Sequence, residues 1–528
     1  MEKQKQKIKS KAYFVGGGIA SLAGAVFLIR DGKFSGDQIT IFEKSEDLGG
    51  SLDGQNSNFK KFYSTRGFRI LEEKIYSCTL DLFSSIPSLQ DPQKTLLHEF
   101  KKFNKKIKIH SKARLIKEGL RINSRSLNIG HENKLALLQL LALPEKLLEG
   151  KRIDEHFTPS FFETNFWIEF CTIFSFQQWH SLIEFKRYLL RVSQDLPVID
   201  TTKTIRITPY NQYDSIISPT VSWLKKQGVN FKNNCEIENV RFGKIQNGKK
   251  IINRIYFKSA GRIKEIQCDK NDYVFLTLGS MTTGSSIGSM DNPAKLKEES
   301  WTLWENIAKK SSNFGKPSVF NGNIEKSKWI SFTITTHDRS FLNMIQQITK
   351  QKTGTEGPMS FPDSNWLITL GIPYRPYFLD QPKDTYVCWG YGLFPDKKGN
   401  FINKKMSECN GKELFLELCY HFGFQNKAQK ILKSTTCIPC MMPYITSQFM
   451  PRKDGDRPQV VPTESENFAF LGQFCEMPED IVFTIEYSVR SAQTAVYKLL
   501  QLDKDVCPIY KGYFSPKIIY DVVKTIFR

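Results

Sequence analysis

A glycine-rich turn near the start of the chain constrains the fold more than any other feature. Residues 12–15 form a short apolar run that enters a glycine triplet at 16–18, and residues 19–29 (IASLAGAVFLI) follow with the composition of a helix rich in small side chains. Residues 38–43 (QITIFE) then have the pattern of a second strand. This order of strand, tight turn, helix and strand predicts the βαβ unit that opens a Rossmann-type nucleotide fold.

The spacing Gly16-x-Gly18-x-x-Ser21 predicts where a dinucleotide would bind. Gly16 permits the tight turn, Gly18 lets a pyrophosphate approach the backbone, and the helix N-terminus offers N–H groups to the phosphates. Ser21 replaces the usual third glycine and is small enough for close packing of helix on strand. Glu43 ends the second strand, where a carboxylate can accept hydrogen bonds from ribose hydroxyls. The alternative is a glycine-rich turn beside a surface glutamate.

A second glycine pair follows the acidic strand. Gly49, Gly50 and Ser51 form a short segment that is able to approach the cofactor. This doubly glycine-marked opening is similar to that of flavoprotein oxidoreductases, so it favours FAD over NAD.

Strands that belong with the nucleotide fold recur far along the chain. Residues 273–278 (YVFLTL) and 468–472 (FAFLG) have the pattern of buried strands, and residues 221–231 indicate a helix running into a strand. The aromatic-rich residues 170–191 indicate a buried helix, and the last clear helix spans 488–500. We expect an α/β fold, a discontinuous Rossmann-type FAD-binding domain with an inserted α+β substrate domain and a small helical C-terminal region. The predicted parts are 1–90, 196–290 and 465–500 for the FAD-binding domain, 91–195 (helical) and 291–464 for the substrate domain, and 501–528 for the C-terminal region.

The formal net charge of +21 favours acidic partners. The Lys and Arg residues are scattered, and neither a zinc-finger spacing nor an RRM-like pattern is present, so nucleic acid is not the expected partner. Anionic membrane surfaces and fatty-acid carboxylates fit the charge equally well, and so does a compositional bias without function.

Cysteine usage and hydropathy predict a cytoplasmic protein that is soluble or peripheral on a membrane. The eleven cysteines lack the spacing of a disulfide framework, which indicates mostly reduced thiols. No apolar run reaches about 18 residues, so no transmembrane helix is expected. The lysine-rich residues 1–11 lack the apolar stretch of a signal peptide.

The C-terminus has the pattern of a short amphipathic helix. After Pro516, apolar residues recur at helical spacing and Lys517, Lys524 and Arg528 supply positive charge. Such a helix can lie in a bilayer interface, or it can pack on the core of the protein or on a second subunit of a homodimer. The apolar residues are Ile518, Ile519, Val522, Val523, Ile526 and Phe527.

Eight longer stretches occur in an order shared with one known family. They are residues 21–54, 80–92 (LDLFSSIPSLQDP), 177–191 (QQWHSLIEFKRYLLR), 209–217 (PYNQYDSII), 387–401 (VCWGYGLFPDKKGNF), 406–414 (MSECNGKEL), 438–452 (IPCMMPYITSQFMPR) and 472–500. Together these stretches resemble the oleate hydratases, formerly called myosin-cross-reactive antigens. The resemblance implies an FAD-requiring enzyme that adds water to an isolated cis double bond of an unsaturated long-chain fatty acid, giving a product such as 10-hydroxystearate.

The resemblance also implies catalytic residues. The family is understood to use a tyrosine as proton donor and a glutamate that orients the water. The tyrosine motif is intact here, with Tyr210 as the first candidate donor and Tyr213 as the second, although both could merely pack and cap a loop. The glutamate motif, RGGRE in many members, is altered to 66–70 (RGFRI), so Ile70 stands where the glutamate is expected. An isoleucine cannot accept a proton or orient water, and Glu72 or Glu73, just downstream, could substitute only if the loop shifts.

Further binding residues follow from the same resemblance. Thr446 and Gln448 are candidates to hold the substrate carboxylate, and Arg375 could pair with it as a bidentate donor or be a surface arginine. Cys437 and Cys440 form a CxxC pair without further ligands at metal spacing, so no metal site is predicted. The additional cofactor-binding candidates are Arg66, Ser280 and Thr484.

Three functions remain open from the sequence. The first is the FAD-dependent fatty-acid hydratase. The second is a redox flavoenzyme acting on unsaturated lipids, which a flavin bleached by NAD(P)H or by a lipid substrate would favour. The third is a catalytically weakened or inactive flavin- and lipid-binding homologue, which the loss of the glutamate at Ile70 would favour.

Overall fold

The computed structural model describes residues 10–52, 54–56, 63–244 and 248–527. The expected nucleotide sheet is present, with five parallel strands in the order β18-β11-β1-β2-β7. Its strands come from the start, middle and end of the chain, which confirms the α/β class and the discontinuous nucleotide fold. The strands are β1 (Ala12–Val15), β2 (Ile39–Phe42), β7 (Asn230–Lys232), β11 (Tyr273–Thr277) and β18 (Phe468–Leu471).

Helices cover the sheet because its central strands are apolar along their whole length. On one face α2 (Ile19–Arg30) packs beside α15 (Ile485–Leu499). The Phe14 and Phe275 rings stack at 4.5 Å between centroids within this core. Gly24 lets α2 come close, since a Cβ there would lie 2.6 Å from the Phe14 ring.

Two further sheets are antiparallel. Next to the nucleotide sheet lies a three-stranded sheet of β8 (Cys235–Lys244), β9 (Lys250–Ser259) and β10 (Arg262–Gln267). The other sheet has eight strands in the order β12-β17-β13-β16-β15-β14-β5-β6, which are antiparallel except for the β14–β5 pair. Its strands are β5 (Leu115–Lys117), β6 (Leu120–Ile122), β12 (Ser286–Ile287), β13 (Trp329–Thr336), β14 (Met359–Ser360), β15 (Ile368–Gly371), β16 (Tyr386–Gly392) and β17 (Thr435–Met442).

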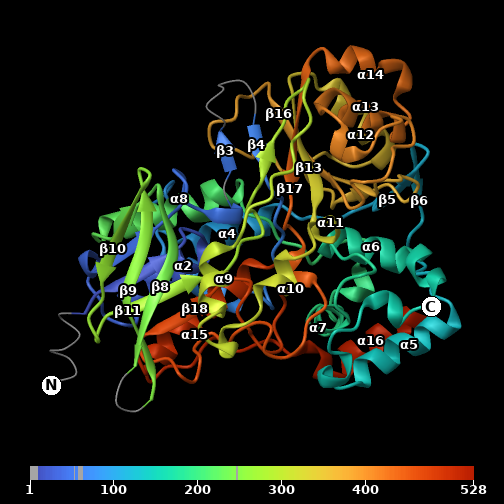
Figure 1. Ribbon diagram of the computed structural model, residues 1–528. Coiled ribbons are helices and arrows are strands. Elements are labelled where there is room, and N and C mark those ends of the chain that lie inside the picture. The colour runs from blue at the N-terminus through green and yellow to red at the C-terminus, as the bar shows by residue number, and fades with distance from the viewer. Residues whose placement is uncertain (1–9, 53, 57–62, 245–247, 528) are drawn as a thin grey trace.

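The eight-stranded sheet extends away from the nucleotide sheet (Figure 1). Its outer end is covered by α12 (Ser340–Thr349), α13 (Gly411–His421) and α14 (Gln425–Leu432), while the hairpin of β3 (Gly54–Asn56) and β4 (Tyr63–Thr65) lies against β13. The remaining helices are α3 (Ser77–Ser85), α4 (Leu96–Lys106), α5 (His131–Ala142), α8 (Ser218–Lys226), α9 (Thr302–Ala308), α10 (Pro317–Asn321), α11 (Ile324–Ser327) and α16 (Pro516–Phe527).

The aromatic segment 170–191 differs from its prediction as one helix. It contains the end of α6 (Asn165–Phe174) and the whole of α7 (Leu182–Arg191). Ser175 ends α6 in a left-handed conformation with φ of 68°, and the Ser181 hydroxyl accepts the N–H of Glu184 to begin α7. Hydrophobic periodicity does not reveal this break because both helices are buried on most sides.

The boundaries predicted for the domains stay a prediction. The N-terminal residues 1–9, which bear on the signal-peptide expectation, lie outside the described residues. None of the helices within the described ranges has the length and apolar character needed to span a membrane.

Candidate functional site

A cavity of about 560 Å³ opens at the carboxyl ends of the parallel strands. Ligands of open α/β sheets bind in this position, outside the strand ends. The cavity is lined by the turn between β1 and α2, the end of β2, and the segments that follow β11 and β18. The lining comprises residues 15–20, 42–45, 49–51, 66, 235–237, 277, 279–285, 299–304, 472–474 and 488.

The N-terminus of α2 faces this cavity. Gly18 is its N-cap, with no side chain accepting the first amides and no acidic residue in the first turn. A Cβ at Gly18 would meet no described atom nearer than the Cα of Gly50, at 4.0 Å. Gly16 has φ of +92°, a left-handed conformation that favours glycine. The turn therefore offers unshielded amides and the positive end of a helix to an anion such as a pyrophosphate.

Glu43 ties the first glycine turn to the segment that follows β2, and a backbone bond joins the two glycine turns. Its Oε2 accepts the Gly17 N–H at 2.7 Å, and its Oε1 accepts the Ser45 N–H at 2.8 Å and the Ser45 hydroxyl at 2.7 Å. The Gly49 N–H donates to the Gly17 carbonyl at 2.9 Å. Each carboxylate oxygen has more than one acceptor site, so ribose hydroxyls can still be bound.

The structure brings most of the predicted cofactor residues to this cavity. Ser21 is buried instead at the interface of helix and strand, with its Oγ 3.4 Å from Thr277 Oγ1. Thr484 lines a neighbouring cavity and caps α15 by accepting the N–H of Tyr487 at 3.1 Å. The predicted residues that line the nucleotide cavity are Gly16, Gly18, Glu43, Gly50, Ser51, Arg66 and Ser280.

The neighbouring cavity is mostly apolar. It lies between the loop 68–76, the ends of α6 and α7, the segment 192–205, one face of the eight-stranded sheet and residues 481–485. Trp329, Trp389 and other aromatic and aliphatic side chains form its wall. A concave, apolar lining with few polar groups suits an acyl chain.

The start of α15 is a wall shared by the two cavities. Residues 481–485 line the apolar cavity, and Ser488, one turn further along, lines the nucleotide cavity. A ligand in one cavity would therefore lie close to a ligand in the other.

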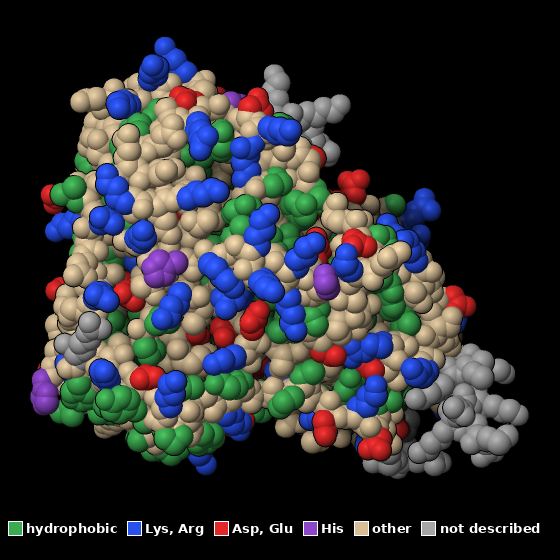
Figure 2. Space-filling model, turned by 180° about the vertical axis from the view of Figure 1, so that it is seen from behind, with side chains coloured by type: hydrophobic (Ala, Val, Ile, Leu, Met, Phe, Trp, Pro, Cys, Tyr) green, Lys and Arg blue, Asp and Glu red, His purple; other side chains and the backbone are tan. Residues whose placement is uncertain are grey.

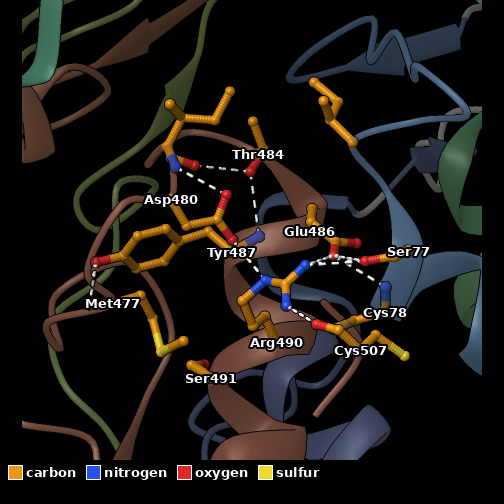
Figure 3. A network of polar contacts seen from close by, with 12 residues as sticks. Ser77, Cys78, Met477, Asp480, Thr484, Glu486, Tyr487, Arg490, Ser491 and Cys507 are labelled. Atoms are coloured by element: carbon orange, nitrogen blue, oxygen red, sulfur yellow. Dashed lines mark hydrogen bonds and ion pairs between the residues drawn. The ribbon is translucent and has the colours of Figure 1, made fainter. Parts of the chain in front are cut away.

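A buried network fixes this shared wall (Figure 3). Arg490 of α15 donates to Asp480 Oδ2 at 2.8 Å and to Glu486 Oε1 at 2.7 Å. Glu486 also accepts the N–H groups of Cys78 and Thr79, each at 2.9 Å, at the start of α3. Removing one partner of such a buried pair typically costs about 3–5 kcal/mol. The network therefore anchors the wall to α3, and the pattern of the sequence did not reveal it.

The altered loop 66–70 lies at the apolar cavity, where Phe68, Arg69 and Ile70 all contribute to the lining. The Arg69 guanidinium lies 5.2 Å from the centre of the Phe483 ring, and burial lowers the pKa of Arg69. Two hydrogen bonds between the backbones of Leu71 and Arg206, each 2.8 Å, fix the end of the loop.

The tyrosine motif contacts the back of this loop. Gln212 Nε2 donates to the Arg69 carbonyl at 3.4 Å, and the Asn211 N–H donates to the Tyr377 carbonyl at 2.7 Å. Burial raises the pKa of Tyr210. Tyr210 and Tyr213 are absent from the lining of the apolar cavity as far as the described residues define it.

The carboxyl groups of Glu72 and Asp195 line the apolar cavity. The sequence alone did not identify them as a pair. Glu72 Oε2 accepts the Ile75 N–H at 2.8 Å, and burial raises the pKa of Glu72. Asp195 Oδ2 accepts from Gln194 Nε2 at 3.0 Å. Burial, followed by the charge of Glu72, raises the pKa of Asp195 to about 7. The two groups are therefore within electrostatic reach of each other.

The predicted carboxylate anchors lie away from this cavity. The Thr446 hydroxyl donates to the Ser327 carbonyl and Gln448 Nε2 donates to the Ile445 carbonyl, each at 3.0 Å, and both side chains are buried. Arg375 stacks on the Tyr386 ring at 4.7 Å. None of Thr446, Gln448 and Arg375 belongs to the described lining of the apolar cavity.

Cys437, Cys440 and His180 are buried and make contacts that are typical of structural residues. Cys437 and Cys440 lie on β17 as reduced, buried cysteines, and burial raises the pKa of Cys437. His180 Nδ1 accepts the Gln177 N–H at 3.0 Å, and burial lowers the pKa of His180 to about 3. No cluster of three metal-ligating side chains occurs in the described part of the chain.

Comparison with known proteins adds the family and the fold. The MCRA family matches residues 9–497. The chain is 36% identical to an oleate hydratase of Streptococcus pyogenes serotype M49 (strain NZ131), over 98% of this chain and 89% of that protein. It is 31% identical to a linoleate hydratase of Lactiplantibacillus plantarum, over 98% and 99% of the two chains.

Solved structures are similar in fold alone. An oxidoreductase from Methanosarcina mazei has a TM-score of 0.52 at 12% identity, covering 92% of this chain and 99% of its own. Cyclohexylamine oxidase from Brevibacterium oxydans IH-35A has a TM-score of 0.52 at 12% identity, covering 93% and 99%.

Proposed function

Because the chain belongs to the MCRA family, we propose that it is an FAD-dependent hydratase that adds water to a cis double bond of unsaturated long-chain fatty acids. The activities named for its relatives and the match over nearly the whole chain support the reaction. The observation that carries the proposal is the pair of cavities on either side of the start of α15, one suited to a dinucleotide and one suited to an acyl chain.

FAD fits the residues of the nucleotide cavity. The amides at Gly18 and the N-terminus of α2 would hold the pyrophosphate, and Glu43 would accept from the ribose. Since hydration transfers no electrons, the bound flavin would supply a polar ring edge that shapes the reaction site. Arg66, whose Nη2 donates to the Gly50 carbonyl at 3.0 Å, would keep the second glycine turn near the cofactor.

The proton donor remains a proposal that rests on the family resemblance. Tyr210 is the first candidate and Tyr213 the second, and the bond from Gln212 to Arg69 ties their motif to the loop at the cavity. If Tyr210 is the donor, Tyr210→Phe should lower kcat by about 100-fold or more and leave flavin content unchanged. The carboxylate anchors Thr446, Gln448 and Arg375 stay predictions.

The deciding experiment is direct. The purified protein is incubated with FAD and oleate or linoleate in ¹⁸O-labelled water, and the products are analysed by mass spectrometry. We expect a hydroxy acid that has gained one labelled water. A bound flavin that is reduced during turnover, with no gain of water, would instead favour a redox flavoenzyme.

We further propose an anionic membrane surface as the source of the substrate. Figure 2 shows hydrophobic side chains gathered at the end of the molecule that carries α5 and α16, while Lys and Arg are spread over the visible face. An insoluble fatty acid would be extracted at such an end. The exposed apolar side chains of this end include Leu135, Leu147, Phe514, Ile519, Tyr520, Val523 and Phe527. The cytoplasmic location and the homodimer stay predictions.

A further inference from the structure

The proposed hydration needs a group that holds and deprotonates the attacking water, and Ile70 cannot be that group. An acceptor must line the apolar cavity, have a free lone pair and be ionised near neutral pH. These three requirements can be tested against each polar group of the lining.

The tyrosine hydroxyls of the cavity are already committed. The hydroxyls of Tyr76 and Tyr188 donate to the carbonyls of Ile70 and Val482 at 3.2 Å and 2.6 Å, and that of Tyr391 donates to a carbonyl of α6. Burial raises the pKa of all three, so their ionised forms are not available near neutral pH. A protonated hydroxyl that donates elsewhere is a poor base.

The charged side chains in the lining of the apolar cavity are those of Arg69, Glu72 and Asp195. Arg69 is a cation and cannot accept a proton. Glu72 is bound through Oε2 to the Ile75 N–H, and the charges of Lys74 and Arg206 act on it from the protein side. Asp195 Oδ1 is buried and has no hydrogen-bond partner of normal geometry among the described residues, although the Thr204 side chain lies close enough to the carboxyl to lower its pKa against the effect of burial. A buried acceptor without a donor is costly, and a water molecule in the cavity is the donor that would satisfy it.

Asp195 lines the same cavity as Ile70, the position of the missing glutamate. Ile70 packs with Ile205, which lines the same cavity as Asp195. Thr204, adjacent to Ile205, also lines the cavity. Asp195 and residues 68–70 therefore line one cavity.

We propose that Asp195 is the catalytic residue that orients and deprotonates the attacking water, and that Glu72 is a positioning residue that tunes it. This inference rests on the proposed hydratase function. In the step, the water oxygen bonds to one alkene carbon while the donor acid gives a proton to the other. The water proton passes to Asp195 Oδ1 and returns through solvent to the donor acid. No electrons are transferred, and the sum is the alkene plus one water.

The pH dependence follows from the charges around Asp195. Asp195 must be ionised to act as a base, so kcat/KM should rise with pH through about 7. Because the charge of Glu72 raises the pKa of Asp195, Glu72→Gln should move this rise to lower pH. The other ionisable groups facing the cavity are Arg69, Tyr76, Tyr188 and Tyr391, with Lys74 and Arg206 acting from outside it.

The test compares variants of the FAD-loaded full-length protein on oleate across pH 5.5–8.5. Asp195→Asn should lower kcat by about 100-fold or more at unchanged flavin content. Adding Ile70→Glu to that variant should restore about tenfold or more, since it returns a carboxylate to the cavity. Glu73→Gln is the matched control, because Glu73 does not line the described cavity and pairs with Arg206 at 3.8 Å. Measuring all variants under the same conditions cancels the ionisation of the substrate itself.

Several outcomes would overturn the inference. If Asp195→Asn keeps more than half of the wild-type kcat with the same pH profile, Asp195 does not handle the water. If Asp195→Asn does not fold, Glu72→Gln decides alone, and an unmoved pH profile rejects the pair. A wild-type protein that adds no water to any cis-unsaturated acid overturns both the proposed function and this inference, whereas an active wild type with unaffected variants overturns the inference only.

Discussion

At the residue scale, Gly18 carries the test of the cofactor site. A Cβ there projects into open space, so Gly18→Val should preserve the fold while its branched side chain fills the space that a pyrophosphate needs. We expect flavin absorbance to disappear from the purified protein and the thermal midpoint without flavin to stay unchanged. Gly24→Ala is the opposite control, because its methyl group would lie 2.6 Å from the Phe14 ring and should destabilise the fold while flavin still binds. Flavin binding by Gly18→Val at the wild-type affinity would mean that the cofactor lies elsewhere.

The loop 66–70 is the second residue-scale test. Ile70→Glu restores the residue type of the family motif, and Phe68→Gly removes the bulk that replaces its second glycine. Because both side chains line the apolar cavity, the double variant should raise kcat about tenfold or more over the wild type. Phe68→Gly alone is the control for a change in cavity shape. An unchanged kcat in the double variant would show that this loop does not border the reacting double bond.

The residues of the nucleotide cavity could be predicted from the sequence more fully than the carboxyl groups of the apolar cavity. The sequence predicts Gly16, Gly18 and Glu43 because a phosphate site depends on backbone geometry that glycine spacing reveals, and the structure places all three at the nucleotide cavity, while their contact with a cofactor stays a prediction. Asp195 follows a helix and looks like an ordinary capping residue, and only the fold shows that burial and Glu72 act on it. The role of a carboxyl group depends on its neighbours, and these come from distant parts of the chain.

At the element scale, α16 presents two different faces. Val522 and Ile526 are buried against the protein, while Ile519, Val523 and Phe527 are 39–47% exposed. Arg528, the last basic residue of the predicted amphipathic helix, lies outside the described residues. One face of α16 therefore packs on the protein, while contact of the other face with a bilayer interface or a second subunit stays a prediction.

The two faces can be tested separately. Ile519→Ser with Val523→Ser should reduce cosedimentation with anionic vesicles at an unchanged thermal midpoint. High salt should also weaken the wild-type binding, because each basic group near the surface contributes roughly 1 kcal/mol that salt screens. Val522→Ala, on the buried face, should lower the thermal midpoint and leave vesicle binding intact. Absence of vesicle binding by the wild-type protein would reject the membrane role of α16.

The strands that could be predicted are those whose pattern is contained in a short stretch of sequence. β1, β2, β11 and β18 were predicted because strands of a parallel sheet are buried on both faces and appear as continuous apolar runs. The eight-stranded sheet was not predicted strand by strand, because its order joins β5 and β6 to strands more than 200 residues away. Pairing over such distances is decided by packing, which no local pattern records.

At the scale of the whole molecule, buried carboxyl groups determine how stability depends on pH. Burial raises the pKa of Glu169 and of Glu356 to about 7. For Asp195, burial and the charge of Glu72 together raise the pKa to about 7. Glu184 behaves oppositely: burial would raise its pKa, but the charges of Arg457, Arg452 and Arg187 outweigh this and lower it to about 2. Glu169, Glu356 and Asp195 therefore stabilise the folded state when they are protonated. Glu184 stabilises the folded state when it is ionised.

The sign of the pH dependence follows from these shifts. A carboxyl whose pKa is raised in the folded state stabilises the fold fully below its unfolded pKa near 4.5, and this contribution is lost as pH rises through about 7. The contribution of Glu184 is present above pH 4.5 and is lost as pH falls toward 2. Stability should therefore be greatest near pH 4–5, and the thermal midpoint should fall as pH rises from about 5 to about 7 and change little above about pH 8.

Glu169→Gln isolates one of these contributions. Burial outweighs the charge of Arg114 and the Ser124 side chain, which lower the pKa of Glu169, so the ionisation of this buried carboxyl is costly. At about 1.4 kcal/mol for each pKa unit, the shift from 4.5 to about 7 corresponds to an upper bound of roughly 3 kcal/mol at pH 8. The variant should raise the thermal midpoint more at pH 8 than at pH 5.5, and thereby flatten the pH profile. An equal change at both pH values would mean that the pKa of Glu169 is not raised in the folded state.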